Sequence, residues 1–118
     1  MVAMTLTEFL LARIAVDEAA ARVDLAAELD GTIHASYGAA AERTLARCAA
    51  HRRIVELHHP LDGGDPETYP WTDETGRTYW PECAECAEKH VDGRGCATLR
   101  ALAVAYADHH DFEEGWKL

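Results

Sequence analysis

The sequence predicts a mainly α-helical fold: an antiparallel helical hairpin of two long helices, plus a third short helix later in the chain. Two long segments in the first half repeat apolar residues at helical spacing. A segment rich in proline and glycine follows His59, which excludes a helix there and leaves room for a small β-hairpin. The 118 residues fit a single domain, residues 1–118.

The first helix is expected over residues 5–29. Thr5 and Glu8 have the spacing of a capping box, in which each side chain satisfies a free amide of the first turn. Asp30-Gly31 ends the helix, because glycine readily adopts a left-handed conformation. The side expected to face the core carries a stripe of apolar residues: Leu6, Leu10, Ile14, Ala21, Leu25 and Leu29.

The second helix is expected over residues 39–57, after a weakly alternating segment, residues 32–37, that favours a short strand. Leu45, Cys48 and Val55 supply the apolar side of this helix, together with Ile54. Because the two long helices are close in sequence, an antiparallel hairpin is the economical arrangement.

Residues 59–96 are expected to form a long loop that contains the β-hairpin. Residues 69–72 and 77–80 would pair across a turn at residues 73–76. Trp71, Tyr79 and Trp80 are expected to cover this loop, since a small core needs large side chains. A loop of this length inside a compact domain requires a physical reason to be ordered.

The third helix is expected over residues 97–107, and the chain then closes with a short C-terminal segment. Phe112 and Trp116 in this segment are expected to fold back onto the core. The buried side of the helix is formed by four residues at helical spacing: Leu99, Leu102, Ala103 and Tyr106.

Three cysteines late in the chain indicate a metal site. Cys83 and Cys86 have the Cys-x2-Cys spacing that lets two thiolates approach one ion from a single tight turn. Cys96 precedes the third helix, where free backbone amides and the positive dipole end stabilise a thiolate. We therefore expect zinc as the cofactor and a zinc-stapled loop. Cys48 lies on the apolar stripe of the second helix, where a cysteine packs as a small hydrophobic residue.

A structural zinc ion requires a fourth ligand. His58 is preferred because it ends the second helix, where the chain turns toward the loop. His90, only four residues beyond Cys86, is an alternative, as are His59 and Cys48. A catalytic zinc would need an open position and a carboxylate base, and the nearby glutamates have the character of solvated acids. We therefore expect no enzymatic activity.

The net charge of −10, from 21 acidic and 11 basic residues, argues against nucleic-acid binding and favours a basic protein partner. No segment approaches the roughly 18 uninterrupted apolar residues of a membrane span, so no membrane association is expected. The first residues lack the pattern of a signal peptide. We expect a cytoplasmic protein, in which cysteines are metal ligands or free thiols more often than disulfides.

Two further clusters have simpler explanations. Asp108-His109-His110-Asp111 could hold a second metal, but histidines also favour the negative end of a helix dipole, and we prefer that reading. A basic strip on the second helix is expected to pair with acids on the first helix rather than with nucleic acid: Arg43, Arg47, Arg52 and Arg53.

Three separated motifs carry a family resemblance: residues 5–14, residues 51–58, and residues 96–103 running into 106–109. They resemble a family of small uncharacterised proteins from actinobacteria and their phages, known only as a domain of unknown function. The resemblance implies that His58 belongs with the three late cysteines. Ala97 stands where that family typically has proline, and the second helix lacks its Asp-Pro start.

The sequence therefore favours a non-enzymatic, zinc-stabilised interaction or regulatory module whose partner is a protein. One alternative is an iron–sulfur redox sensor, because Cys48, Cys83, Cys86 and Cys96 resemble the four-cysteine order of WhiB-type regulators. The tryptophan–glycine turn of that family is absent after Cys96. Another alternative is an acidic mimic of nucleic acid, which rests on the net charge alone.

Overall fold

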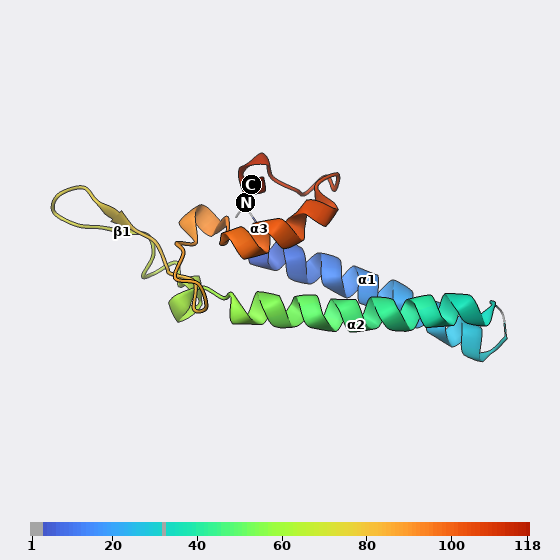
Figure 1. The fold of residues 1–118 in the computed structure, drawn as a ribbon. Coiled ribbons are helices and arrows are strands. Elements are labelled where there is room, and N and C mark those ends of the chain that lie inside the picture. Colours follow the sequence, from blue (N-terminus) through green and yellow to red (C-terminus); the bar gives the residue numbers. More distant parts are fainter. Residues whose placement is uncertain (1–3, 32) are drawn as a thin grey trace.

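The computed structural model describes residues 4–31 and 33–118, and it is dominated by two long helices that run side by side. Helix α1 (Leu6–Leu29) and helix α2 (Ala35–Leu57) form the antiparallel hairpin that the sequence predicts (Figure 1). Helix α3 (Ala97–Ala103) and the C-terminal segment pack over only one end of this pair. The molecule is therefore elongated, with extents of 66 × 27 × 24 Å.

Helix α1 begins where the capping box predicts. The Thr5 hydroxyl accepts a hydrogen bond from the amide of Glu8 at 3.2 Å, and the Glu8 carboxylate accepts one from the amide of Thr5 at 3.4 Å. These bonds satisfy two amides that have no partner inside the helix. Gly31 follows the helix with φ +81°, as expected of a left-handed stop.

Helix α2 begins four residues earlier than the sequence predicts, and the strand expected around it is wrong for residues 35–37, which are helical. Residue 32 lies outside the described residues. The reason for the early start is His34, whose Nδ1 accepts a hydrogen bond from the amide of Ser36 at 3.1 Å. Histidine is not among the usual capping residues, so this start could not be predicted from the capping pattern.

The core lies at the end of the helix pair that α3 covers. Phe9 of α1 packs against Trp116 and Phe112, with ring centroids 5.0 and 6.1 Å apart. This confirms that the C-terminal segment folds back onto the core. The fully buried side chains that surround these rings come from α1, α2 and α3: Leu6, Leu10, Ile14, Val55 and Leu99.

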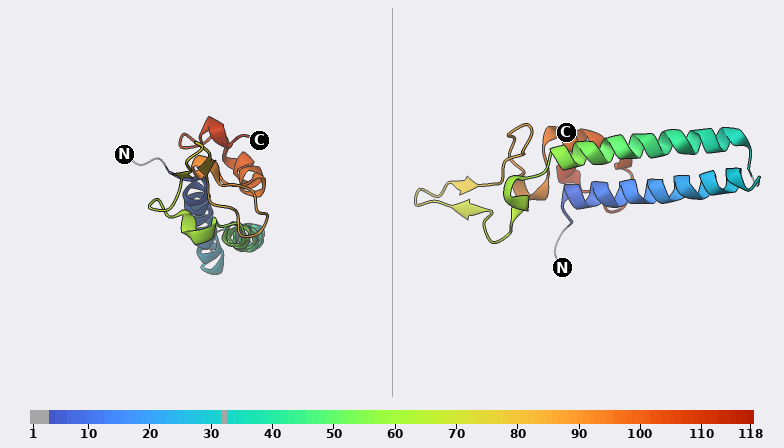
Figure 2. Two further views of the ribbon diagram at one scale, coloured as in Figure 1. Left: turned by 90° about the vertical axis from the view of Figure 1, so that its left-hand side faces the viewer. Right: turned by 90° about the horizontal axis from the view of Figure 1, so that it is seen from below.

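The far end of the helix pair, near the α1–α2 turn, has no such cover (Figure 2). Its contacts use small side chains: Ala21 and Ala41 are buried, and a Cβ on Gly38 would lie 2.6 Å from Cγ of Glu28. The predicted apolar stripe of α1 therefore ends early. Leu29 is 79% exposed, and the sequence missed Phe9 as a core residue.

The β-hairpin forms where predicted, but it is shorter, with β1 (Trp71–Thr72) paired antiparallel to β2 (Thr78–Tyr79). It projects from the body at the end opposite the α1–α2 turn (Figure 2). Trp71 and Tyr79 stack on each other at 4.1 Å rather than covering the loop, and Trp71 remains 48% exposed. The expectation that these two rings cover the loop is wrong, because the hairpin leaves the body.

Helix α3 starts at Ala97 as predicted, but it ends at Ala103 and continues as a single 3₁₀ turn, Val104–Tyr106. Its buried side is the one predicted: Leu99 and Ala103 are buried, and Leu102 and Tyr106 pack against the core. The Tyr106 hydroxyl also donates a hydrogen bond to Asp17 at 2.8 Å, which links this segment to α1. None of the described helices is long and apolar enough to cross a membrane.

Replacing Leu10 by alanine should lower the free energy of unfolding by about 2–5 kcal/mol, because a buried leucine leaves a cavity when it is truncated. Leu29→Ala is the matched control in the same helix, since Leu29 is 79% exposed and Leu10 is 1% exposed. The control should change stability by less than about 0.5 kcal/mol. Urea unfolding followed by circular dichroism measures both. Equal losses would contradict the described core.

Stability should fall as the pH rises from about 10, the pKa of an unfolded tyrosine. Burial and the hydrogen bond to Asp17 raise the pKa of Tyr106 to about 12. A folded pKa above the unfolded value gives stability that is complete below the unfolded pKa and is lost toward the folded one. Melting temperatures between pH 9 and 12 should fall less steeply for Tyr106→Phe than for the wild type. Tyr37→Phe, at an exposed tyrosine, should leave the slope unchanged.

Candidate metal centre

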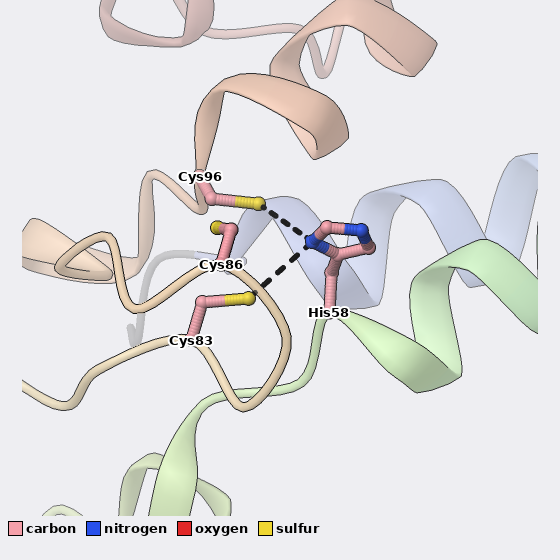
Figure 3. Close-up of side chains that lie close together, drawn as sticks. All are labelled: His58, Cys83, Cys86 and Cys96. Atoms are coloured by element: carbon pink, nitrogen blue, oxygen red, sulfur yellow. Dashed lines mark hydrogen bonds between the residues drawn. The ribbon is translucent and has the colours of Figure 1, made fainter.

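Three separate segments meet at one point and bring together the four residues that the sequence selects. His58 comes from the end of α2, Cys83 and Cys86 from the loop after the hairpin, and Cys96 from the residue before α3 (Figure 3). One ligand atom from each of these residues lies within 4.8 Å of all the others. This group can therefore hold a metal ion.

The distances match those that a tetrahedral ion requires. Nδ1 of His58 lies 3.4 Å from the sulfur of Cys83 and 3.5 Å from the sulfur of Cys96. Zinc bonds of about 2.3 Å to sulfur and 2.0–2.1 Å to nitrogen, at tetrahedral angles, separate nitrogen from sulfur by about 3.6 Å. The imidazole is thus oriented with Nδ1 toward the sulfurs (Figure 3). These two nitrogen–sulfur distances therefore fit a shared ion.

The turn between Cys83 and Cys86 is a tight knuckle. The amide of Ala87 donates to the carbonyl of Cys83 at 3.0 Å, and Ala87 has a left-handed φ of +61°. The chain then reverses, so that the amide of Cys83 donates to the carbonyl of Glu88 at 2.7 Å. The sulfurs of Cys83 and Cys86 lie within 4.8 Å of each other. Left-handed alanine is strained, which indicates that surrounding contacts fix this turn.

Backbone hydrogen bonds hold the knuckle beside the end of α2. Ala84 donates to the carbonyl of His59 at 2.9 Å, and Leu61 donates to the carbonyl of Glu82 at 2.8 Å. Pro60 and Cys83 form an isolated antiparallel bridge. The segment after His58 and the segment around Cys83 are therefore joined as a short ladder. This ladder places His58 next to the first two cysteines.

The thiols of the cluster have different proton affinities. Burial works to raise the pKa of Cys83, but hydrogen bonds from the amides of Cys86 and Glu85 outweigh it, and the pKa is lowered overall. Burial raises the pKa of Cys96 to about 11, and negative charge on the neighbouring cysteines acts in the same direction. Three adjacent thiolates repel one another without a cation. A bound divalent ion would remove this repulsion and displace the protons.

The other proposed ligands lie outside the cluster. Cys48 is buried in the helical core, ten residues before His58, which places it about 15 Å away along α2 at a rise of about 1.5 Å per residue. His59 turns its Nδ1 toward the carbonyl of Glu56 at 2.7 Å. His90 is 5% exposed and lies in the wall of a neighbouring pocket, where burial lowers its pKa.

The glutamates near the cluster are engaged elsewhere or face solvent. Glu82 forms a salt bridge with Lys89 at 2.7 Å, and the carboxylate of Glu88 accepts a hydrogen bond from the amide of Ala97 at 3.0 Å. Glu85 is exposed. No carboxylate belongs to the ligand group in the described part of the chain. The ligand group therefore consists of one imidazole and three thiols.

A second group, His109, His110 and Asp111, is also close enough to hold an ion. Its chemistry is unfavourable for a cation. The guanidinium of Arg13 lies 2.8 Å from Nε2 of His109, and the amide of Asp111 lies 3.1 Å from Nδ1 of the same ring. Both ring nitrogens are therefore engaged, one of them by a positive charge. The structural reading of this segment is the better one.

The arginines that form the basic strip on α2 include two that form salt bridges with acidic side chains. Arg52 forms a salt bridge with Glu18 of α1, as predicted, and Arg53 pairs with Glu56 within its own helix. The side chain of Arg53 is 69% exposed. Two of the four arginines of the strip are therefore paired with acidic side chains, and Arg43 and Arg47 are exposed.

Comparison with known proteins gives one match. The sequence model of a family of unknown function (DUF6221) matches residues 3–118. No curated protein and no solved structure matches the chain. The matched region includes both long helices, the hairpin and all four residues of the metal cluster. The match confirms that the chain is an uncharacterised domain, as the three sequence motifs suggest.

Cys96→Ala should abolish stoichiometric metal binding, because a tetrahedral site with three remaining ligands holds an ion far more weakly. Cys48→Ala should keep the metal, since Cys48 is a core residue. Metal content per chain, measured by plasma mass spectrometry after purification without chelators, checks both variants. Loss of metal from Cys48→Ala with retention in Cys96→Ala would exclude the described cluster as the binding site.

Proposed function

The chain belongs to the family of unknown function DUF6221, and from its metal centre we propose that it is a non-enzymatic, zinc-stapled module that binds a protein partner. The observation that carries this proposal is the closed set of four ligands from three distant segments. Four protein ligands complete the coordination of a structural zinc ion and leave no position for a substrate or water. The ion would then act on folding rather than on chemistry.

The donor set supports zinc in particular. Three thiols and one imidazole are soft and borderline ligands, and zinc takes them in tetrahedral geometry. When bound, zinc would supply folding free energy by joining the loop of residues 59–96 to α2 and α3. His58, Cys83, Cys86 and Cys96 would hold it. These thiols must stay reduced, which agrees with a cytoplasmic location.

An interaction role is supported by what surrounds the metal. The loop presents exposed side chains, including the stacked Trp71, and a projecting hairpin that contributes little to the core. The net charge of −10 favours a basic partner and disfavours nucleic acid. A small domain that uses a metal to order a loop gains a rigid surface for recognition.

The iron–sulfur alternative loses its original argument, because it required Cys48 as the fourth ligand. Cys48 is a residue of α2 that is buried in the helical core, and burial raises the pKa of its thiol. Elemental analysis separates the two hypotheses directly. One zinc per chain in colourless protein supports the proposal. Iron and sulfide in anaerobically purified protein, with visible absorbance, would replace it with a redox sensor.

Removing zinc should unfold the second half of the chain before the helical hairpin. A chelator should lower the melting temperature and increase amide hydrogen exchange in residues 59–96, whereas the buried amides of α1 and α2 exchange later. Hydrogen-exchange mass spectrometry with and without the chelator measures this. Re-addition of zinc should restore protection. Unchanged exchange in the loop after complete metal removal would contradict the structural role.

Partner binding should depend on the metal. Immobilised wild-type protein should capture a basic protein from an extract of the organism that encodes it, and Cys96→Ala should not. Cys48→Ala is the matched control, because it removes a thiol outside the cluster. Capture that is identical for all three baits would show that the metal-ordered loop is not the binding surface. A hydrolytic activity lost in Glu85→Ala would overturn the non-enzymatic proposal.

A further inference from the structure

A pocket of about 600 Å³ lies between the first turn of α1 and the loop that carries the cysteines. Its apolar wall consists of two aromatic rings, Tyr69 and Trp80, and of Pro60, Pro66 and Pro81. Pockets that bind small organic groups have volumes of about 300–1,000 Å³ and similar walls. Since proline fixes its own backbone angle, much of this wall keeps its shape without a ligand.

The charged side chains in this pocket are acidic, apart from its histidines. Glu8 and Asp92 line it, and no lysine or arginine of the described residues does. One oxygen of Glu8, Oε1, accepts from the amide and hydroxyl of Thr5 in the capping box. Oε2 has no such partner among the described bonds. Both carboxylates belong to exposed residues, so a ligand can reach them from the surface.

His90 belongs to the wall of the same pocket. His90 is only 5% exposed. Its Nε2 has no hydrogen-bond partner in the structure. A buried polar group without a partner costs about 1–3 kcal/mol. The backbone amide of His90 is fixed by the carbonyl of Pro81 at 2.8 Å, so the ring cannot easily leave. Because Nε2 is itself buried, the ring forms part of the pocket wall and does not offer a contact atom to a ligand.

We propose that this pocket binds the side chain of a lysine or arginine from the protein partner, held by Tyr69, Trp80, Glu8 and Asp92. Tyr69 and Trp80 line the pocket with aromatic surface that attracts a cation, and the carboxylates of Glu8 and Asp92 would neutralise its charge. This inference rests on the proposed function, because it names the group that the module recognises. The net charge of −10 would steer a basic partner toward it.

A side chain fits this site better than a free small cation. The two carboxylates lie at exposed positions, whereas Tyr69 and Trp80 are partly buried, so a ligand that contacts all four reaches inward from the surface. A long basic side chain does this while its backbone stays outside. The metal cluster would set the pocket wall, since Pro60 bridges to Cys83 and Pro81 lies two residues before it.

The test uses the zinc-loaded full chain and short capped peptides. Two-dimensional ¹H–¹⁵N correlation NMR spectra of the protein are recorded while one of three peptides is added. The peptides are Gly-Ser-Arg-Ser-Gly, its lysine equivalent, and a peptide that carries neutral citrulline instead of arginine. Free methylguanidinium and butylammonium form a separate arm. The Glu8→Gln/Asp92→Asn variant removes both charges and keeps the shape, because glutamine preserves a capping box and asparagine tolerates the φ of +55° at position 92.

The basic peptides should shift the indole N–H signal of Trp80 and the signals of His90, and the citrulline peptide should not. The double variant should bind at least about tenfold more weakly, as expected for lost charge-assisted bonds. Glu42→Gln/Asp24→Asn removes the same charge from exposed positions on the helix pair and should bind like the wild type. Equal weakening by both double variants would overturn the proposal, because it would indicate long-range charge alone.

Other outcomes also decide the question. Binding of the free cations that equals or exceeds binding of the basic peptides would overturn the assignment to a partner's side chain. Equal shifts with the citrulline peptide would overturn the requirement for a cation. Absence of peptide binding in protein with one zinc and an unchanged melting temperature would remove this inference alone. A metal-independent capture of the partner would instead remove the proposed function.

Discussion

The convergence of one imidazole and three thiols on a single point is the constraint on which the second half of this chain depends. Residues 59–96 contribute few side chains to the apolar core, and two of those few are Cys83 and Cys96 themselves. A loop without its own core cannot offset the conformational entropy of ordering about forty residues. Coordination of one ion by groups from three segments would provide that free energy in place of apolar burial.

The metal centre and the helical core are joined through α3. Cys96 is the residue before this helix, and Leu99, only three residues later, is fully buried against α1. Gly95 makes the junction possible, because its φ is +72° and a Cβ there would lie 3.0 Å from Leu6. Fixing Cys96 therefore also fixes the residue that completes the core. Loss of coordination at Cys96 should therefore weaken the packing of α3 against α1, although none of the four cluster residues belongs to α1.

The same backbone that gathers the cysteines also forms a surface hollow with a distinct chemistry. Pro60 and Pro81 flank the ladder beside His58 and Cys83, and both also line the pocket that contains His90 and Trp80. A metal site of this kind can therefore have a role in recognition without taking part in any reaction. The distal half of the helix pair presents mainly small and charged residues.

The sequence by itself determined the features that depend on local chemistry. The capping box at Thr5, the stop at Gly31, the knuckle spacing of Cys83 and Cys86, and the start of α3 all follow from neighbouring residues. Only the tertiary structure decided which distant groups meet. Helical spacing cannot show that α3 and Trp116 cover one end of α1, so it could not reveal Phe9 as buried or Leu29 as exposed. It likewise left His58, His90 and Cys48 as competing ligands, because coordination depends on distances across the fold, which sequence separation does not fix.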